Sequence, residues 1–211
     1  MTLFPVDKRH NRTNIHSIVS GRPTDTRNRE EAILKAALEL FGERGFYGTT
    51  VPSVVERAEI AAGTFYHYFE SKEQLVNVVY RRWKSEVARL ILTDFPADHP
   101  PREQFRVTWE RMTEFALAHP KELAFLELHQ HGSYLDSESQ AIENQTLDFG
   151  VMMLQRAQAA QALKPMDPAV LMAIVNGAFI GIVRQGIEKR VALTRETLMA
   201  AEVCCWEAIR A

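Results

Sequence analysis

The sequence predicts an all-α protein of about nine helices, made of a three-helix N-terminal head and a larger C-terminal helical domain. Apolar residues recur three and four positions apart along most of the chain, which is the period of an amphipathic helix. Capping Ser, Thr and Asp residues and helix-ending Gly and Pro residues separate these stripes. No stretch alternates long enough with the two-residue period of a strand, and the chain contains no internal repeat.

Residues 1–24 carry no periodic pattern and end in the turn signal Gly21-Arg22-Pro23. We expect a flexible basic N-terminal extension here, because Lys and Arg outnumber Asp and Glu before residue 30. A solvated tail and a segment that contacts DNA are both consistent with this composition. The basic residues are Lys8, Arg9, Arg12, Arg22, Arg27 and Arg29, and the acidic ones are Asp7 and Asp25.

The first domain, residues 25–70, is expected to contain three helices. Asp25 or Thr26 can cap the first helix, and Gly42 and Gly45 close it. The apolar side of this helix faces inward and consists of Ile33, Leu34, Ala37, Leu38 and Phe41.

Two short helices complete this first domain. Thr49 or Thr50 caps the second helix, whose first turn tolerates Pro52. A third helix follows from about Ala62 to Phe69, after a short break. The inward residues of the second helix are Val51, Val54, Val55 and Ala58.

The second domain, residues 71–211, begins with a long helix. Ser71 and Gln74 form a capping box, and the helix is expected to run until Phe95-Pro96. Asp167-Pro168 is another strong helix start, because it joins a capping oxygen to a preset φ. The remaining helices are expected at about 101–119, 123–129, 137–163, 168–190 and 194–211.

Composition places the chain among ordinary soluble globular proteins, with 46% hydrophobic and 25% charged residues. No window approaches the roughly 18 apolar residues that span a bilayer, so no membrane partner is expected. The polar first twenty residues do not form a secretory signal. The adjacent Cys204 and Cys205 cannot make a disulfide framework, which fits a reducing cytoplasm.

Charge is divided unevenly along the chain, although the net charge is only −2. Residues 1–84 carry 13 Lys and Arg against 10 Asp and Glu, whereas residues 85–211 carry 12 against 17. A mildly basic head on an acidic body is the distribution expected of a protein that contacts nucleic acid with one end.

Residues 49–75 carry the clearest functional signal. Two helices joined by a turn of three to four residues form a helix-turn-helix, whose second helix lies in the DNA major groove. The ordered pattern over residues 27–75 resembles the TetR family of bacterial transcriptional regulators, which the later helices match only in number and length. The matching residues are Ala36, Leu40, Phe41, Gly45, Thr49, Thr50, Ala58, Gly63, Thr64, Tyr66, Phe69 and Lys72.

The resemblance implies contacts with double-stranded DNA. Thr50 would donate to a phosphate while capping its helix, and Lys72 would pair with the DNA backbone. Thr64 and Tyr66 would touch phosphate or base edges. A half-buried Tyr66 ring that only holds the third helix in place is the structural alternative. The full expected set is Arg27, Thr50, Ala62, Gly63, Thr64, Tyr66, His67, Tyr68 and Lys72.

Three positions depart from the family pattern. Glu59 stands where a turn glycine is common; a retained left-handed φ would cost about 1–2 kcal/mol, and otherwise the turn differs. Ala61 replaces a capping Ser, a loss of about 1 kcal/mol. Ala62 offers DNA only a methyl group, so we expect sparse direct base recognition and a contribution from DNA shape.

Family members pair through their last two long helices, so the resemblance implies a homodimer. The helix from Asp167 to Arg190 is apolar nearly all round, unlike a helix on the surface of a monomer. A central core helix of a monomer is the alternative. The expected interface residues are Val170, Ile174, Gly177, Gly181 and Trp206, of which the two glycines allow close helix approach.

Large, soft side chains in the middle helices predict a pocket for an apolar or amphipathic small-molecule effector, with core packing as the alternative for each residue. Glu127, His129 and His131 also suggest a metal site, but on a helix His129 would point away from the other two. We therefore expect no metal or cofactor, and expect His129 or Tyr134 to orient the ligand. The predicted lining is Trp109, Met112, Phe115, Phe125, His129 and Met152.

No Gly-rich phosphate loop and no nucleophile motif appears, so no enzymatic activity is expected. A DNA-architectural protein without a ligand is a third class, but most of the second domain would then serve dimerisation alone. The sequence therefore predicts a dimeric, ligand-responsive repressor that binds a palindromic operator and is released by its effector. Repression rather than activation rests on the resemblance.

Overall fold

Most residues of the part of the chain that the computed structural model describes, 26–129 and 131–211, lie in helices, which confirms the predicted all-α class. Within these residues, extended backbone pairs only in an isolated bridge between Leu163 and Arg210. The predicted extension at 1–24 and the proposed cap at Asp25 lie outside the described residues. The helices are α1 (Thr26–Gly48), α2 (Val51–Arg57), α3 (Ala62–Tyr68), α4 (Lys72–Leu92), α5 (Pro101–Ala118), α6 (Pro120–Leu128), α7 (Ser137–Ala159), α8 (Pro168–Ile187) and α9 (Arg195–Ile209).

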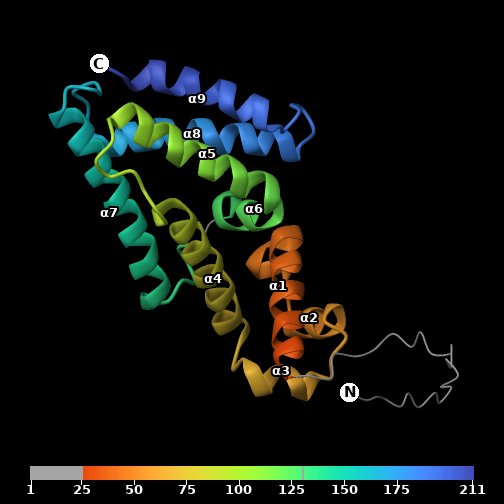
Figure 1. Ribbon diagram of the computed structural model, residues 1–211. Coiled ribbons are helices and arrows are strands. Elements are labelled where there is room, and N and C mark those ends of the chain that lie inside the picture. Colours follow the sequence, from red (N-terminus) through yellow and green to blue (C-terminus); the bar gives the residue numbers. More distant parts are fainter. Residues whose placement is uncertain (1–25, 130) are drawn as a thin grey trace, which may run out of the picture.

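The α2–α3 pair lies at one end of the molecule, and α8 and α9 lie at the opposite end (Figure 1). Between them, α4 starts directly after α3 and runs alongside α7, while α6 packs on α1 and α5 packs on α9. Three residues separate the start of α4 from the end of α3, with extended backbone at Phe69 and Ser71.

One hydrophobic core joins the head to the helices behind it. The Phe41 ring of α1 stacks on Phe125 of α6, with the ring centroids 6.1 Å apart. Near the end of α1, Phe46 stacks on Tyr134, which follows α6. The head is therefore packed against α6 and the segment after it, in addition to its covalent link to α4.

Three helices end in a left-handed residue that is not glycine. Glu59 after α2, Gln161 after α7 and Lys189 after α8 have φ angles of 54°, 57° and 58°. In each case the next N–H donates to the carbonyl five positions back, which is the Schellman arrangement that ends a helix. For this reason α7 and α8 end at Ala159 and Ile187, before the predicted 163 and 190.

Two predicted helix boundaries differ in detail. Gly45, with a φ of 69°, divides α1 into two helices at a kink, so it ends the first of them as predicted, and a short second helix continues to Gly48. At the start of α4, Ser71 Oγ accepts from the Gln74 N–H at 3.1 Å, as predicted. The Gln74 side chain, however, accepts from the Glu70 N–H at 2.6 Å, one residue before the cap.

α8 is long and apolar enough, by length and composition alone, to cross a membrane. The sequence-based statement that no window approaches this length is therefore wrong. Only 17% of its 18-residue apolar window is buried, so α8 is not a core helix of the single chain either. An exposed apolar surface of this kind is typical of an interaction site.

Candidate DNA-binding and effector sites

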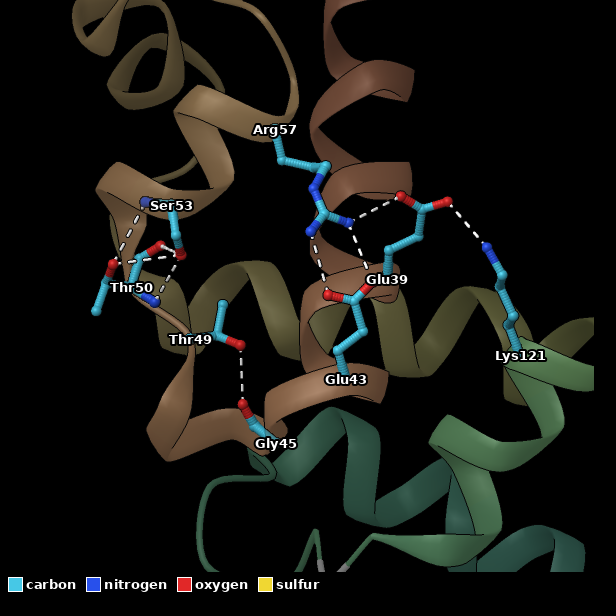
Figure 2. Close-up of polar contacts among 8 residues, drawn as sticks. All are labelled: Glu39, Glu43, Gly45, Thr49, Thr50, Ser53, Arg57 and Lys121. Atoms are coloured by element: carbon cyan, nitrogen blue, oxygen red, sulfur yellow. Dashed lines mark hydrogen bonds and ion pairs between the residues drawn. The ribbon is translucent and has the colours of Figure 1, made fainter. Parts of the chain in front are cut away.

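The N-terminus of α2 is held by a reciprocal cap (Figure 2). Thr50 Oγ1 accepts from the Ser53 N–H at 3.3 Å, and Ser53 Oγ accepts from the Thr50 N–H at 3.1 Å. Thr49, which is fully buried, donates its hydroxyl to the Gly45 carbonyl at 2.8 Å. The exposed Thr50 hydroxyl therefore has a defined position at the start of α2.

Ion pairs tie α2 to α1 and α1 to α6 (Figure 2). Arg57 lies 3.3 Å from a Glu39 oxygen and 3.1 Å from a Glu43 oxygen. Lys121 of α6 reaches the other Glu39 oxygen at 3.1 Å. The hydrogen bond from Lys121 is the main cause that lowers the pKa of Glu39. These pairs are largely exposed, so they orient the helices more than they stabilise them.

The turn between α2 and α3 keeps the left-handed geometry without a glycine. The φ angle of Glu59 is 54°, and the N–H groups of Glu59 and Ile60 donate to Glu56 and Val55 at 3.1 and 3.2 Å. Of the two sequence-based alternatives, the structure therefore has the one that costs about 1–2 kcal/mol. As expected, the Ala61 side chain makes no capping hydrogen bond at the start of α3.

One face of α3 is buried and the other is open to solvent. Phe65 and Phe69 are 0% and 3% exposed, whereas Tyr66 is 61% exposed, which does not match the half-buried alternative. Thr64 is half-buried, and Arg27 is exposed on the first turn of α1. Exposed with Tyr66 on one face of α3 are Ala62, Gly63 and His67.

Lys72 and Tyr68 make contacts within the head. Lys72 Nζ donates to the carbonyls of Phe46 and Thr49 at 2.8 and 2.9 Å, and lies 4.1 Å from the centre of the Phe46 ring. The Tyr68 hydroxyl donates to the Thr26 carbonyl at 3.0 Å. In this structure Lys72 ties the start of α4 to the end of α1, and Tyr68 ties α3 to the start of α1. Lys72 uses two of its three ammonium N–H groups in these contacts, so one remains for a further acceptor.

A second candidate site is a cavity of about 270 Å³ bordered mainly by α4, α5, α7 and α8, with Glu127 of α6 and Trp206 of α9 also in its wall. Of the predicted lining residues, Trp109 and Met112 border this cavity. The others do not: Phe115 and Phe125 are buried in the core, and His129 and Met152 lie elsewhere, with Met152 37% exposed. The wall also contains the large apolar residues Ile91, Phe95, Phe105, Phe149, Met153 and Phe179.

Two of the predicted lining residues that lie outside the cavity pack against other aromatic rings. Phe125 stacks on Phe41, which ties α6 to α1, and Phe115 packs edge-on against Trp83 of α4. Core packing, the alternative noted for each residue, therefore describes Phe115 and Phe125. Periodicity shows which residues face inward, but it does not separate a cavity wall from solid core.

The polar end of the cavity is an ion-paired lysine. Lys84 of α4 is 8% exposed and lies 3.1 Å from Glu127 Oε1 and 2.9 Å from Glu143 Oε2. The Tyr80 hydroxyl donates to the same Glu143 oxygen at 2.5 Å. Burial lowers the pKa of Lys84, but the two carboxylates outweigh burial and the net pKa is raised. Burial likewise raises the pKa of Glu143, but Lys84 and Tyr80 bring it below its ordinary value.

His131 lies beyond the end of α6 at Leu128, so the expectation that it shares a helix face with Glu127 is wrong. Its Nε2–H donates to the Phe125 carbonyl at 2.7 Å, and its Nδ1 accepts from the Tyr134 hydroxyl at 2.8 Å. Burial lowers the pKa of His131, which keeps the ring neutral. Burial also raises the pKa of Tyr134 to about 12.

Neither His129 nor Tyr134 borders the cavity, so the predicted ligand-orienting role does not fit their positions. No group of three metal-ligating side chains lies close together within residues 26–129 and 131–211. The sequence analysis does not predict Lys84 or Glu143 as site residues. Lys84 does carry a signal, because it stands on the inward stripe of α4 between Tyr80 and Val87, and a buried cation requires partners.

Family models match both parts of the chain. Residues 33–79 match the tetR family of bacterial regulatory proteins, and residues 80–211 match the tetracyclin repressor-like C-terminal domain. The chain belongs to the TetR family. This family consists of DNA-binding transcriptional regulators and is not an enzyme family.

Similar proteins include the "Probable acrEF/envCD operon repressor" of Escherichia coli K12, 26% identical over 163 residues that cover 73% of this chain and 74% of that protein. The transcriptional repressor KstR2 of Mycolicibacterium smegmatis is 39% identical over 59 residues, 28% of this chain and 29% of that protein. A TetR-family regulator from Marinobacter aquaeolei VT8 has a similar structure, with a TM-score of 0.75 at 22% identity over 87% of this chain and 96% of that one. This last likeness shows a shared fold.

At the end opposite the head, this TetR-family regulator exposes an apolar face on α8. Val170 and Ile174 are 47% and 40% exposed. A Cβ added at Gly177 or Gly181 would meet nothing within 4 Å, so the backbone there is open to close approach. On the neighbouring α9, Val203 is 52% exposed.

Trp206 does not belong to this face. Its side chain is 9% exposed, its ring lies 5.4 Å from that of Phe105, and it borders the cavity. The predicted interface role of Trp206 is corrected accordingly, because α9 turns this residue toward α5.

Proposed function

We propose that this protein is a cytoplasmic, homodimeric transcriptional repressor that binds a palindromic operator and releases it when a small apolar or amphipathic molecule enters the cavity. In this proposal residues 25–70 bind DNA, and residues 71–211 bind the effector and form the dimer. The observation that best supports DNA binding is the exposed face of α3, which includes Tyr66.

The exposed α3 face suits the DNA major groove, because its short side chains let the helix backbone come close while Tyr66 and His67 reach further. The exposed Thr50 hydroxyl at the start of α2 donates to Ser53 Oγ at 3.3 Å here, and in the complex it would donate to a phosphate instead. Ala62 and Gly63 provide no polar group for base edges, which supports a large contribution from DNA shape.

The α8 face supports the dimer. An exposed apolar surface that includes Val170 and Ile174 is unfavourable in water, and a second copy of the same helix covers it with matching open glycine positions. A two-fold dimer presents two α3 helices, which matches the two half-sites of a palindrome.

The cavity supports a response to ligand, because α4 lines it and only three residues separate α4 from α3. A ligand that enters the cavity between α4, α5, α7 and α8 would change the tilt of α4 and thereby the distance between the two heads. For a typical coupling of about 1–3 kcal/mol, the ligand must bind the spread form about 5- to 150-fold more tightly.

Selection of bound duplexes from a random DNA pool tests the proposal. We expect enrichment of a palindrome whose half-sites are about one helical turn apart. Enrichment of a non-palindromic site would contradict the dimeric arrangement, and failure to enrich any sequence would contradict the regulator. Persistent binding without sequence preference would favour an architectural DNA-binding protein.

A further inference from the structure

We propose that the cavity binds an amphipathic cation: a molecule with an apolar body and a positively charged nitrogen at the end formed by Glu127 and Glu143. This inference rests on the proposed effector site and adds its chemical class. It follows from the charges, the unused acceptor atoms and the wall of the cavity.

The charged residues at the cavity wall do not balance. They are Lys84, Glu127 and Glu143, so two carboxylates face one ammonium and leave a formal charge of −1. Lys84 is 8% exposed and already paired with both carboxylates. The wall of the cavity therefore keeps a net negative charge, which a positively charged ligand would neutralise.

Each carboxylate still has an oxygen available. Glu127 uses Oε1 and Glu143 uses Oε2 toward Lys84, and the Tyr80 hydroxyl donates to that same Glu143 oxygen. Within the described residues, Glu127 Oε2 and Glu143 Oε1 make no hydrogen bond. Both side chains are 32% exposed, so these oxygens can be reached by the donor N–H groups of a ligand.

The rest of the wall suits an apolar body that carries such a charge. Trp109 packs edge-on against Phe179, with ring centroids 5.3 Å apart, and Phe105 lies beside Trp109. These rings bury hydrocarbon, and their faces also attract cations. Uncharged polar side chains are few along the wall and are limited to Gln104, Thr108, Thr146 and Asn176.

An anionic amphiphile fits this end poorly. Its carboxylate would have to take Lys84 from one of two existing partners at 2.9 and 3.1 Å, and the displaced glutamate would then lie beside another negative group. Like charges held together away from water are unfavourable. A neutral alcohol avoids this repulsion but leaves the negative excess in place.

Three probes with the same chain separate these cases: decylammonium, decanol and decanoate, each titrated below its micelle concentration at pH 7.5. Fluorescence of the tryptophans reports binding, because Trp109 and Trp206 border the cavity. We expect decylammonium to bind at least about 10-fold more tightly than decanol, and decanoate to bind most weakly.

The Glu127→Gln variant leaves Lys84 and Glu143 as a balanced pair, so the preference for decylammonium over decanol should fall to about 2-fold or less while decanol affinity is kept. Glu114→Gln removes an exposed carboxylate of α5 outside the cavity and should leave the preference unchanged. A folded Glu127→Gln protein with the full preference would overturn the inference.

Equal binding of decylammonium and decanol, or tighter binding of decanoate, would overturn the cationic class while leaving the effector pocket in place. Failure of all three probes to bind would overturn the pocket itself. Operator selection by the free protein is measured separately, so loss of the cationic class does not affect the DNA-binding proposal.

Discussion

The Tyr134 ring stacks on the Phe46 ring, with centroids 4.2 Å apart and planes 24° from parallel. Tyr134 also donates to His131, while Lys72 lies over the same Phe46 ring and donates to the Thr49 carbonyl. A residue between α6 and α7 is thereby connected to the segment that starts α2. This contact is the closest aromatic stack in the described chain, and it joins the body to the head.

Removing the stack of Tyr134 on Phe46 should destabilise the protein and increase local unfolding of the head. We expect Tyr134→Ala to lower the free energy of unfolding by about 2–4 kcal/mol, because it empties a packed site and leaves His131 without its donor. Hydrogen exchange of amides in residues 49–68 should become faster. Tyr134→Phe keeps the stacked ring and should show little change there; equal acceleration in both variants would mean that the ring contact does not order the head.

Glu59 should be replaceable with a gain in stability. Glycine adopts a φ of 54° without strain, so Glu59→Gly should raise the free energy of unfolding by about 0.5–1 kcal/mol after the entropy cost of glycine. Urea denaturation measures this change. Glu56→Gly, inside α2, is the matched control and should lose about 1 kcal/mol. A lower urea midpoint for Glu59→Gly than for the wild type would show that the left-handed backbone of Glu59 is not strained.

Stability should depend on pH through His131. Its pKa in the folded protein lies below the ordinary value of 6.5, so the unfolded chain binds the proton more readily. The stabilisation is therefore complete above about pH 6.5 and is lost as the pH falls below it. The carboxyl groups with lowered pKa, such as Glu143, titrate below 4.5 and do not contribute in this window.

Thermal unfolding between pH 7.5 and 5.5 tests this dependence. The unfolding temperature of the wild type should fall across the range, and that of His131→Gln should fall less, because glutamine can still donate to the Phe125 carbonyl but does not titrate. Identical slopes for the two proteins would assign the pH dependence to other groups.

A charge on the α8 face should separate the dimer. Ile174→Glu places an unpaired carboxylate in the proposed interface, so the dimer dissociation constant should rise at least about 100-fold. Sedimentation measures the change. Leu117→Glu alters a similarly exposed apolar residue on α5 and should leave the association state unchanged. If the Ile174→Glu protein remains fully dimeric, the dimer interface does not include this face of α8.

Local chemistry made most helix starts predictable. Thr50, Ser71, Asp167 and Thr194 each accept a hydrogen bond from the first turn of a helix, as their side chains indicate. Helix ends were less predictable, because Gln161 and Lys189 adopt a left-handed conformation that usually indicates glycine.

The candidate effector site was predictable only in part. Trp109 and Met112 face the cavity, but the sequence does not distinguish them from Phe115, which faces solid core on the same helix. The pairing of Lys84 with Glu143 joins residues far apart in the chain, so no local pattern indicates it.

The most direct test of the central claim is the affinity of Tyr66→Ala for the selected palindrome, measured by fluorescence anisotropy at fixed salt. Tyr66 is 61% exposed, so its loss should not affect folding, and the circular dichroism spectrum serves as the control. We predict a loss of affinity of at least about 10-fold. An unchanged affinity in a folded Tyr66→Ala dimer would contradict DNA recognition by the exposed face of α3.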